Sequence, residues 1–484
     1  MDFKISDIYI GVNDGKKEAL YKSDFEKYFI DYNNMYDEVL KPEKYLILGQ
    51  KGSGKTILAQ YIKKQSKINA LWFCDIKSFK DFRFHELVHL KTNDIAPNEY
   101  SAIWRWIILV ELSKQILQDN GIQDKENLAK LETFFKENYY SIDIDSKKVV
   151  ELTKTRKING SILKSILALG GELSSESTHS ESSYLSYLED LERVLLKLLS
   201  TSKSRHTIFF DELDDRFQND IFYKNSIISL IKSADSINCT LVEKNLDAKI
   251  ILLIRSDIFS ILNDTDLNKI KLSNSIEITW GEKVSAASPL ISLLIQKAKR
   301  SNRYLDQFED IEVFNQLFPQ HINGVKPERF MLERTLFRPR DLVTFLNLII
   351  TRYPSSRYFG WKGFLEMKNK YSEYFIDEIR NEMSGHLESE EIDQGLRLLK
   401  NYNRYFFMYT ELKDYYASQR VHYPKIELDK LLVLFFKFNV IGNKWHNAYK
   451  NKEYYTWAHR DHKAELDFGK QLVIHLGLRE ELSM

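Results

Sequence analysis

A glycine-rich stretch near residue 50 has the residue types and spacing of a phosphate-binding loop. Residues 49–56 match the pattern G-x-x-x-x-G-K-[ST]. They follow an apolar run at residues 45–48, which we interpret as a buried strand, and precede residues 57–65, which we interpret as the start of a helix. The free N–H groups and the positive dipole end of a helix N-terminus bind anions. This context favours a phosphate site over an ordinary glycine turn.

The residues of this loop have separable roles. The loop consists of Gly49, Gln50, Lys51, Gly52, Ser53, Gly54, Lys55 and Thr56. Its glycines allow the backbone to wrap around phosphates without Cβ clashes. We expect Lys55 to reach the β- and γ-phosphates and the Thr56 hydroxyl to bind Mg²⁺. The sequence therefore predicts ATP and Mg²⁺ as ligands.

A pair of carboxylates follows a second apolar run, at residues 207–210. Large apolar residues in succession are typical of a strand buried on both faces. Asp211 at its end can hold Mg²⁺ through water, and Glu212 can orient and deprotonate an attacking water. A plain strand end is the alternative for this motif taken alone. Asp214 and Asp215 follow, and they tune the metal, hold a basic neighbour or cap the next helix.

Three arginines are candidates for contacting the γ-phosphate. Arg255 ends a third apolar run, where its planar fork of donors can reach a phosphate. A surface ion pair with Asp257 or a helix-capping role is the alternative. Arg338 and Arg340 begin a helical pattern and can reach back over a nucleotide, in the same chain or across a subunit interface. A stabilising pair with Asp341 is the alternative there.

Composition limits the class of protein. The 484 residues predict two to four domains, and 70 Lys plus Arg against 69 Asp plus Glu leave nearly no net charge. Cys74 and Cys239 lie far apart and form no metal or redox motif, which fits a reducing compartment. We find no signal peptide and no membrane-spanning apolar stretch, so we expect a soluble, cytoplasmic protein without membrane contact.

The motifs divide the chain into three predicted domains of an α/β protein. Residues 1–280 are expected to form a P-loop core, a parallel sheet with flanking helices, which carries a helical insertion at about residues 95–200. The insertion is either a partner surface or lid, or passive bulk, and its serine-rich residues 173–183 predict a mobile surface loop. Residues 281–385 are expected to form a helical lid, and residues 386–484 a winged-helix-like domain.

Positive charge gathers near the C-terminus. Residues 397–463 contain thirteen Lys or Arg against six Asp or Glu, a net charge of +7. Helical patterns at residues 405–408 and 425–439 precede a basic, aromatic hairpin, as in a winged helix, which grips DNA phosphates or docks a protein. The expected phosphate contacts are Lys444, Lys450, Lys452 and Arg460. His475 is expected to be a core or capping residue rather than a catalyst.

Together, the loop at residues 49–56, the run 209–212, the strand ending in Arg255 and residues 338–341 resemble the AAA+/STAND-related P-loop ATPases of bacteria. The pattern is most similar to stand-alone ATPases with an Asp-Glu-Leu-Asp-Asp acidic motif, which are often encoded in phage-defence or mobile-element loci. The resemblance covers roughly residues 5–480.

The resemblance implies a role for each matching residue. Lys55 and Thr56 would contact phosphate and Mg²⁺, and Asp211 would contact Mg²⁺. Glu212 would be the catalytic base, Arg255 the sensor 1 residue and Arg340 the sensor 2 residue.

An arginine at the sensor 1 position departs from the Asn or Thr common in AAA+ proteins and is similar to the Thr-Thr-Arg type of STAND switches. It favours a switch over a processive motor. The hypothesis is an ATP-hydrolysing switch or sensor that controls a homo-oligomer or a separate effector protein in bacterial anti-phage defence. The alternative is a DNA-binding ATPase similar to origin-recognition and helicase-loading proteins.

Overall fold

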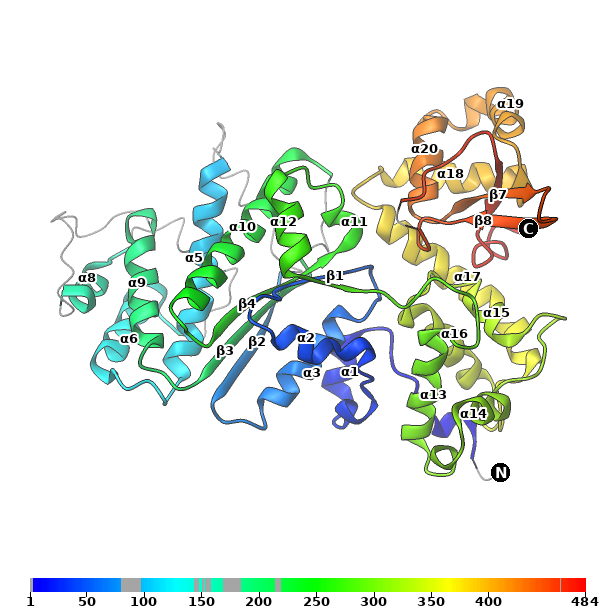
Figure 1. Ribbon diagram of the computed structural model, residues 1–484. Helices are drawn as coiled ribbons and strands as arrows, with labels where there is room; N and C mark the ends of the chain where they lie inside the picture. Colours follow the sequence, from blue (N-terminus) through cyan, green and yellow to red (C-terminus); the bar gives the residue numbers. More distant parts are fainter. Residues whose placement is uncertain are drawn as a thin grey trace. The chain divides into compact units, whose positions relative to one another are not determined.

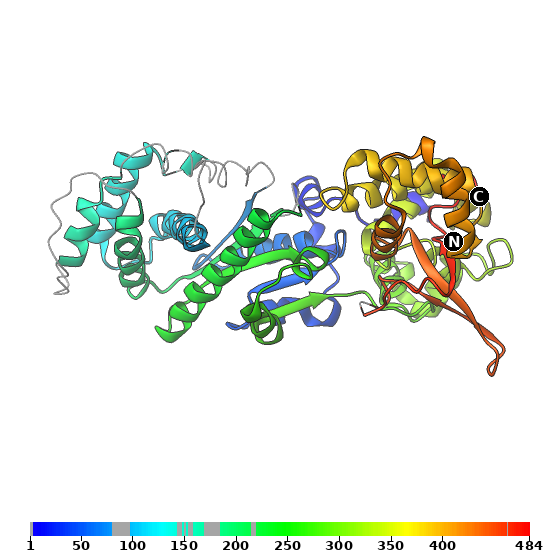
Figure 2. The same cartoon turned by 90° about the horizontal axis from the view of Figure 1, so that it is seen from above.

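The computed structural model describes residues 3–79, 97–142, 148–149, 152, 158–168, 184–213, 219–461 and 463–484 (Figures 1 and 2). The chain divides into two compact units. The first unit consists of Asn33–Gly49 and Lys55–Ile278. The second unit consists of Met1–Tyr32, Gln50–Gly54 and Thr279–Met484. Residues 1–32 therefore group with the C-terminal half, although the sequence analysis assigned them to the core. The predicted serine-rich loop at residues 173–183, and the predicted roles of Asp214 and Asp215, lie outside the described residues.

A five-stranded parallel sheet forms the centre of the first unit, with strand order β2-β3-β4-β1-β5. The strands are β1 (Leu46–Gly49), β2 (Trp72–Ser78), β3 (Arg205–Asp211), β4 (Ala248–Arg255) and β5 (Ser275–Ile278). Strands β1, β3 and β4 are almost wholly buried and are each centred on an apolar run, because helices cover both faces of a parallel sheet. The three strands that the apolar runs predicted are confirmed.

Helices lie on both faces of this sheet (Figure 1). On one face lie α2 (Met35–Leu40) and α3 (Lys55–Ser66), and on the other lie α10 (Ile221–Glu243) and α12 (Thr265–Asn274). Four further helices pack together beside α10 and belong to the predicted insertion, namely α5 (Pro97–Gln118), α6 (Lys125–Tyr139), α8 (Ser161–Ala168) and α9 (Leu188–Leu199). The Trp104 indole N–H donates to Ser226 Oγ at 3.1 Å, which joins α5 to α10. The inserted helices are thus part of this unit's core.

The second unit contains a bundle of helices. They are α13 (Pro289–Ser301), α14 (Asp310–Leu317), α15 (Pro327–Leu332), α16 (Pro339–Arg352) and α17 (Trp361–Met383). The buried rings of Phe345 and Tyr371 stack with their centroids 4.5 Å apart and hold α16 against α17. The N-terminal helix α1 (Gly15–Tyr21) joins this bundle through Glu18, whose carboxylate lies 3.4 Å from Lys297 Nζ.

The last hundred residues combine helices with a small antiparallel sheet of order β6-β9-β7-β8. The elements are α18 (Ser389–Tyr402), β6 (Phe406–Phe407), α19 (Tyr409–Gln419), α20 (Leu428–Lys437), β7 (Ile441–Asn447), β8 (Lys452–Thr456) and β9 (Gln471–Ile474). The helix predicted at residues 405–408 is wrong, because Phe406 and Phe407 pair with β9. Four residues are too few to display a helical period, and adjacent aromatic residues favour a strand.

His475 is a core residue, as predicted. Its ring is buried and stacks on Phe375 with centroids 5.1 Å apart. Burial, followed by the nearby arginine charges, holds the pKa of His475 well below its usual value. Among the residues that the structure describes, no helix combines the length and the apolar character that crossing a bilayer requires.

Candidate functional site

The glycine-rich loop connects the end of β1 to the first residue of α3. Gly52 and Gly54 have φ angles of +79° and +107°, a region that residues with a Cβ rarely adopt. The Lys55 ammonium donates a 2.8 Å hydrogen bond to the Gly49 carbonyl, so the two ends of the loop are held together at its base. The predicted strand, glycine turn and helix are therefore all present.

Thr56 and Asp211 meet at the carboxyl edge of the sheet. The Thr56 hydroxyl donates to Asp211 Oδ2 at 2.8 Å, and the other carboxylate oxygen accepts from the Glu212 backbone N–H at 2.8 Å. Asp211 is buried although it is an acid. A hydroxyl and a carboxylate are hard oxygen donors, the ligand type that Mg²⁺ prefers.

No group of three or more His, Cys, Asp and Glu side chains that could hold a metal occurs among the described residues. Mg²⁺ commonly binds through one or two protein oxygens and completes its shell with water and substrate phosphates. The Thr56 and Asp211 pair fits that mode and does not fit a metal cage made wholly of protein side chains.

Glu212 has a backbone conformation that is unusual for its residue type. Its φ angle is +57°, in the left-handed region that costs a non-glycine residue roughly 1–2 kcal/mol. Its carboxylate accepts a hydrogen bond from the Ser78 hydroxyl, and Ser78 lies opposite Asp211 in the β2–β3 register. Such backbone strain concentrates at functional sites. Ser78, a polar residue at the end of β2, was not among the predicted site residues.

Arg255 ends β4 directly beside the loop strand, since it pairs in register with Gly49. Its guanidinium is buried and grips Asp257 with both arms, at 3.0 Å from Nε to Oδ1 and 2.6 Å from Nη2 to Oδ2. The ion pair that the sequence analysis offered as the alternative is therefore present. It also fixes the arginine at the edge of the sheet where Asp211 lies.

Arg340 belongs to the second unit, as does the tip of the loop. The Arg340 backbone N–H points to the Gly52 carbonyl at 3.5 Å, and a Cβ added to Gly52 would lie 2.9 Å from the Arg340 Cβ. The guanidinium donates to Glu378 Oε2 at 3.1 Å, and the same oxygen lies 3.6 Å from Lys51 Nζ. Burial favours neutral Glu378, but the Lys51 and Arg340 charges lower its pKa.

Two buried polar atoms at the loop tip find no hydrogen-bond partner among the described residues. They are Arg340 Nε and Ser53 Oγ. The Ser53 carbonyl, by contrast, accepts a 2.7 Å hydrogen bond from the Trp280 indole. Because an unsatisfied buried donor costs about 1–3 kcal/mol, these atoms suit an anion that would accept from them.

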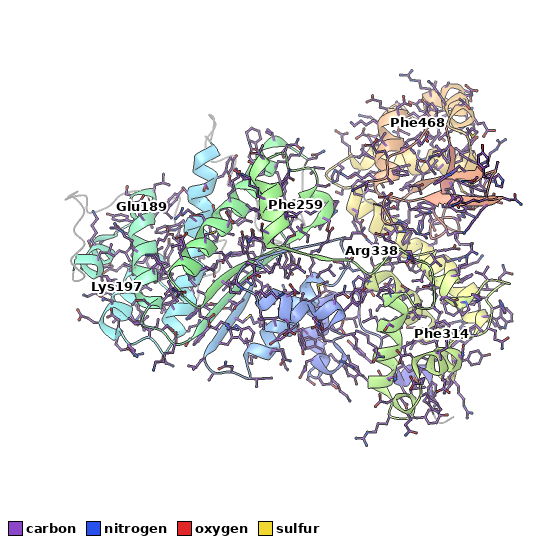
Figure 3. The ribbon with its side chains drawn as sticks, viewed as in Figure 1. Glu189, Lys197, Phe259, Phe314, Arg338 and Phe468 are labelled. Carbon is purple, nitrogen blue, oxygen red and sulfur yellow. The ribbon has the colours of Figure 1, made fainter. Side chains whose placement is uncertain are left out.

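Arg338 has a structural position instead. It is buried, with 1% of its side chain exposed, and both arms bind Asp341, at 3.0 Å and 2.9 Å. It also pairs with Glu382 on α17, and Figure 3 labels it among the helices there. Glu378 and Glu382 stand four residues apart on one face of α17, and each receives one of the two arginines.

The four basic residues predicted to contact phosphates divide into two pairs. Lys444 forms a 2.7 Å ion pair with Glu453, and Arg460 lies over the Phe337 ring at 5.1 Å from its centroid. Lys450 and Lys452 are exposed on the hairpin. Only the second pair is free to contact a partner without rearrangement.

The fold and the site together define a mixed α/β protein with a five-stranded parallel sheet and a helical C-terminal part. The FunZ-associated C-terminal helical domain matches residues 289–380, which run from the start of α13 into α17. A curated protein of Escherichia coli (strain K12), described as "Putative transposon gamma-delta 80.3 kDa protein", is 24% identical over 330 residues. The match covers 66% of this chain and 44% of that protein, so the chain spans less than half of its relative's length.

Proposed function

We propose that this chain is a P-loop ATPase that works as a nucleotide-driven switch. The observation that carries the proposal is the 2.8 Å hydrogen bond between Thr56 and Asp211. It joins the last residue of the glycine-rich loop to the acid at the end of β3, although other strands and helices separate the two in sequence. Strand β4, which ends in Arg255, lies between β1 and β3. All three strands therefore present their candidate residues at the carboxyl edge, where parallel sheets bind ligands.

The residues at this edge suit binding and hydrolysis of ATP. Lys55 and the loop N–H groups would bind the phosphates, and Thr56 and Asp211 would hold Mg²⁺, which neutralises charge on the transferring phosphoryl group. Glu212 would accept a proton from the water that attacks the γ-phosphorus. The bond from that phosphorus to the bridging oxygen then breaks, and ADP leaves with the bond's electron pair.

Arg340 supplies the switching element of the proposal. Its guanidinium binds Glu378, and its buried Nε finds no partner among the described residues. A γ-phosphate would offer both donors a new acceptor, so ATP and ADP would leave α16 with different contacts. We propose that this difference controls a homo-oligomer or a separate effector protein, in bacterial anti-phage defence or in the mobile-element setting that the relative's description names.

The alternative proposal is a DNA-binding ATPase. Its support is the C-terminal arrangement of α18, α19 and α20 with a β7–β8 hairpin, the order of a winged helix. Residues 397–463, which hold most of these elements, carry a net charge of +7, whereas residues 386–484 as a whole carry +1. A local cluster of positive charge is the footprint of phosphate binding.

Mass photometry of the full chain without nucleotide, with ADP and with ATP tests the switch. We expect ATP alone to change the mass distribution. ATP hydrolysis measured with and without duplex DNA tests the alternative, which requires stimulation. A chain that neither binds nor hydrolyses ATP contradicts both proposals.

A further inference from the structure

The β7–β8 hairpin ends in an uncovered aromatic ring. The strands pair in register up to Asn447 and Lys452, and the hairpin extends away from the helices of its own unit (Figure 2). The Asn447 side chain accepts from the Lys450 backbone N–H at 3.1 Å, and Asn451 has a φ of +43°, so the turn has a defined structure. Tyr449 at the tip is fully exposed, with a relative accessibility of 103%.

One face of the hairpin alternates aromatic rings with cations. The rings of Trp445 and Tyr454 stack, with centroids 5.6 Å apart and planes at 19°. Lys470 Nζ lies 4.4 Å from the Trp445 centroid, and Lys452 Nζ lies 5.8 Å from the Tyr454 centroid. These four side chains place rings and ammonium groups on one face, and Tyr449 lies in the turn at the end of the hairpin. We call the five side chains the aromatic strip.

The opposite face has no such excess of charge. Lys444 and Glu453 point to that face and neutralise each other at 2.7 Å. Lys450 and Lys452, in contrast, form no ion pair within the part of the chain that the structure describes. Lys470 pairs with Asp467 at 3.1 Å, so the unpaired positive charge of the hairpin is that of Lys450 and Lys452, at its tip.

We propose that the aromatic strip binds DNA through unpaired bases, with Tyr449 stacked on a base and Lys450 and Lys452 on the adjacent phosphates. Phosphate binding alone would need only the lysines and would leave the exposed ring unexplained. Every base has a face on which an aromatic ring can stack, and single-strand binders combine such rings with cations along the backbone. The inference deepens the DNA-binding alternative and does not depend on ATP hydrolysis.

Fluorescence anisotropy of the full chain, without nucleotide, tests this inference. The probes are a labelled single-stranded DNA of mixed sequence, the blunt duplex of the same sequence and the matching RNA. We expect the wild-type chain to bind the single-stranded DNA more tightly than the blunt duplex. Tyr449→Ala should weaken single-strand binding at least about fivefold and leave duplex binding nearly unchanged. Tyr358→Ala, which removes an exposed ring from the helical bundle, is the control and should change neither.

The salt dependence separates the lysines from the ring. Charge reversal of Lys450 and Lys452 should flatten the dependence of binding on salt by up to about two units, because each contact contributes roughly 0.7 to 0.9. Tyr449→Ala should leave that slope unchanged. Circular dichroism checks that the variants keep the wild-type fold.

Three results would overturn the inference. They are wild-type single-strand affinity in Tyr449→Ala, absence of binding to any DNA at low salt, and tighter binding to the RNA than to the DNA. Concentration-dependent self-association that Tyr449→Ala abolishes would assign the strip to a second copy of the chain instead, through the edge strand β8. Because Lys55→Ala should retain wild-type DNA affinity, a failure of the ATPase proposal is distinguishable from a failure here.

Discussion

The Thr56 hydroxyl donates a 2.8 Å hydrogen bond to the Asp211 carboxylate across 155 positions of sequence. The donor is the second residue of α3, and the acceptor is the last residue of β3. The bond forms because the parallel sheet places the carboxyl ends of β1 and β3 at the same edge.

Lys55→Ala should weaken ATP binding or abolish turnover, because a cation fixed near the phosphates is lost. A hydrogen bond to a charged group contributes about 1.5–3 kcal/mol, so we expect affinity to fall roughly 10- to 150-fold. Isothermal titration calorimetry measures the change. Lys63→Ala is the matched control, since Lys63 lies on the same helix and pairs with Asp75 at 3.2 Å. Equal ATP affinity and turnover in Lys55→Ala and wild type would exclude the phosphate role.

Glu212→Gln should keep nucleotide binding and lose hydrolysis. The amide keeps the shape of the side chain and its bond to Ser78 but cannot accept a proton from water, which typically costs on the order of 10²–10⁴ in rate. Single-turnover phosphate release measures it. Glu243→Gln, an exposed position at the end of α10, is the control. Hydrolysis within a few-fold of wild type would move the base to another residue, with Asp214 and Asp215 next in line.

Arg340→Ala and Arg255→Ala should bind ADP like wild type but respond poorly to ATP. The Arg340 variant should respond poorly because it lacks the donors that face Glu378 and the loop. The Arg255 variant should respond poorly because it lacks the guanidinium beside Gly49. Mass photometry with ADP and with ATP reads the response. If both variants hydrolyse ATP and change assembly like wild type, the two arginines serve the fold alone.

Arg338→Ala should destabilise the protein far more than Arg340→Ala. Removing one partner of a buried ion pair leaves an uncompensated charge, which costs about 3–5 kcal/mol. Asp341, with 0% of its side chain exposed, would be that charge. Urea unfolding measures the loss. Arg329→Ala breaks an exposed pair with Glu333 and should cost less than about 1 kcal/mol. If Arg338→Ala lowered the free energy of unfolding no more than Arg329→Ala does, the buried role of Arg338 would be wrong.

Asp119 should stabilise the fold in a pH-dependent way. It is buried just after α5 and accepts hydrogen bonds from Ser202 at 2.5 Å, Ser204 at 2.9 Å and the Gly121 N–H at 2.7 Å, with His206 Nε2 at 3.3 Å. Burial raises the pKa of Asp119, but these hydrogen bonds outweigh burial and lower it below the ordinary value.

A lowered folded-state pKa means that this stabilisation is complete above the unfolded pKa, near 4, and is lost as the pH falls below it. Asp119→Asn should therefore lose on the order of 2 kcal/mol at neutral pH, and the gap to wild type should narrow in acid. Denaturant unfolding across pH measures both. If the difference in unfolding free energy between wild type and Asp119→Asn stayed constant from neutral pH to pH 3, the lowered pKa of Asp119 would be contradicted.

The sequence predicted the strands at the centre of the site better than the contacts at its margins. Residues 45–48, 208–210 and 250–254 are continuous apolar runs, a pattern typical of strands that are covered on both faces. Strand β5 alternates buried and half-buried residues in the sequence Ser-Ile-Glu-Ile and was missed, since four residues give too short a pattern.

The ion-pair partners of the arginines could not be predicted from the sequence, because they depend on how segments distant in the sequence pack together. Arg338 and Arg340 both lie at the start of one helix and near one aspartate, and the sequence alone does not distinguish them. The structure separates them, since Arg338 takes both oxygens of Asp341 while Arg340 faces the loop. The carboxylates that receive them lie on α17, about forty residues later, and no motif marks them.

Glu378 has a further consequence for any anion that approaches the loop. One carboxylate serves two cations, Lys51 and Arg340, so the loop carries its own intramolecular competitor for the ligand. If the loop binds ATP as proposed, the phosphates would have to displace that carboxylate from Lys51 and Arg340. The net gain in free energy would then be the difference between two competing anions, so a weak or singly charged anion would bind poorly and a highly charged polyphosphate would be favoured.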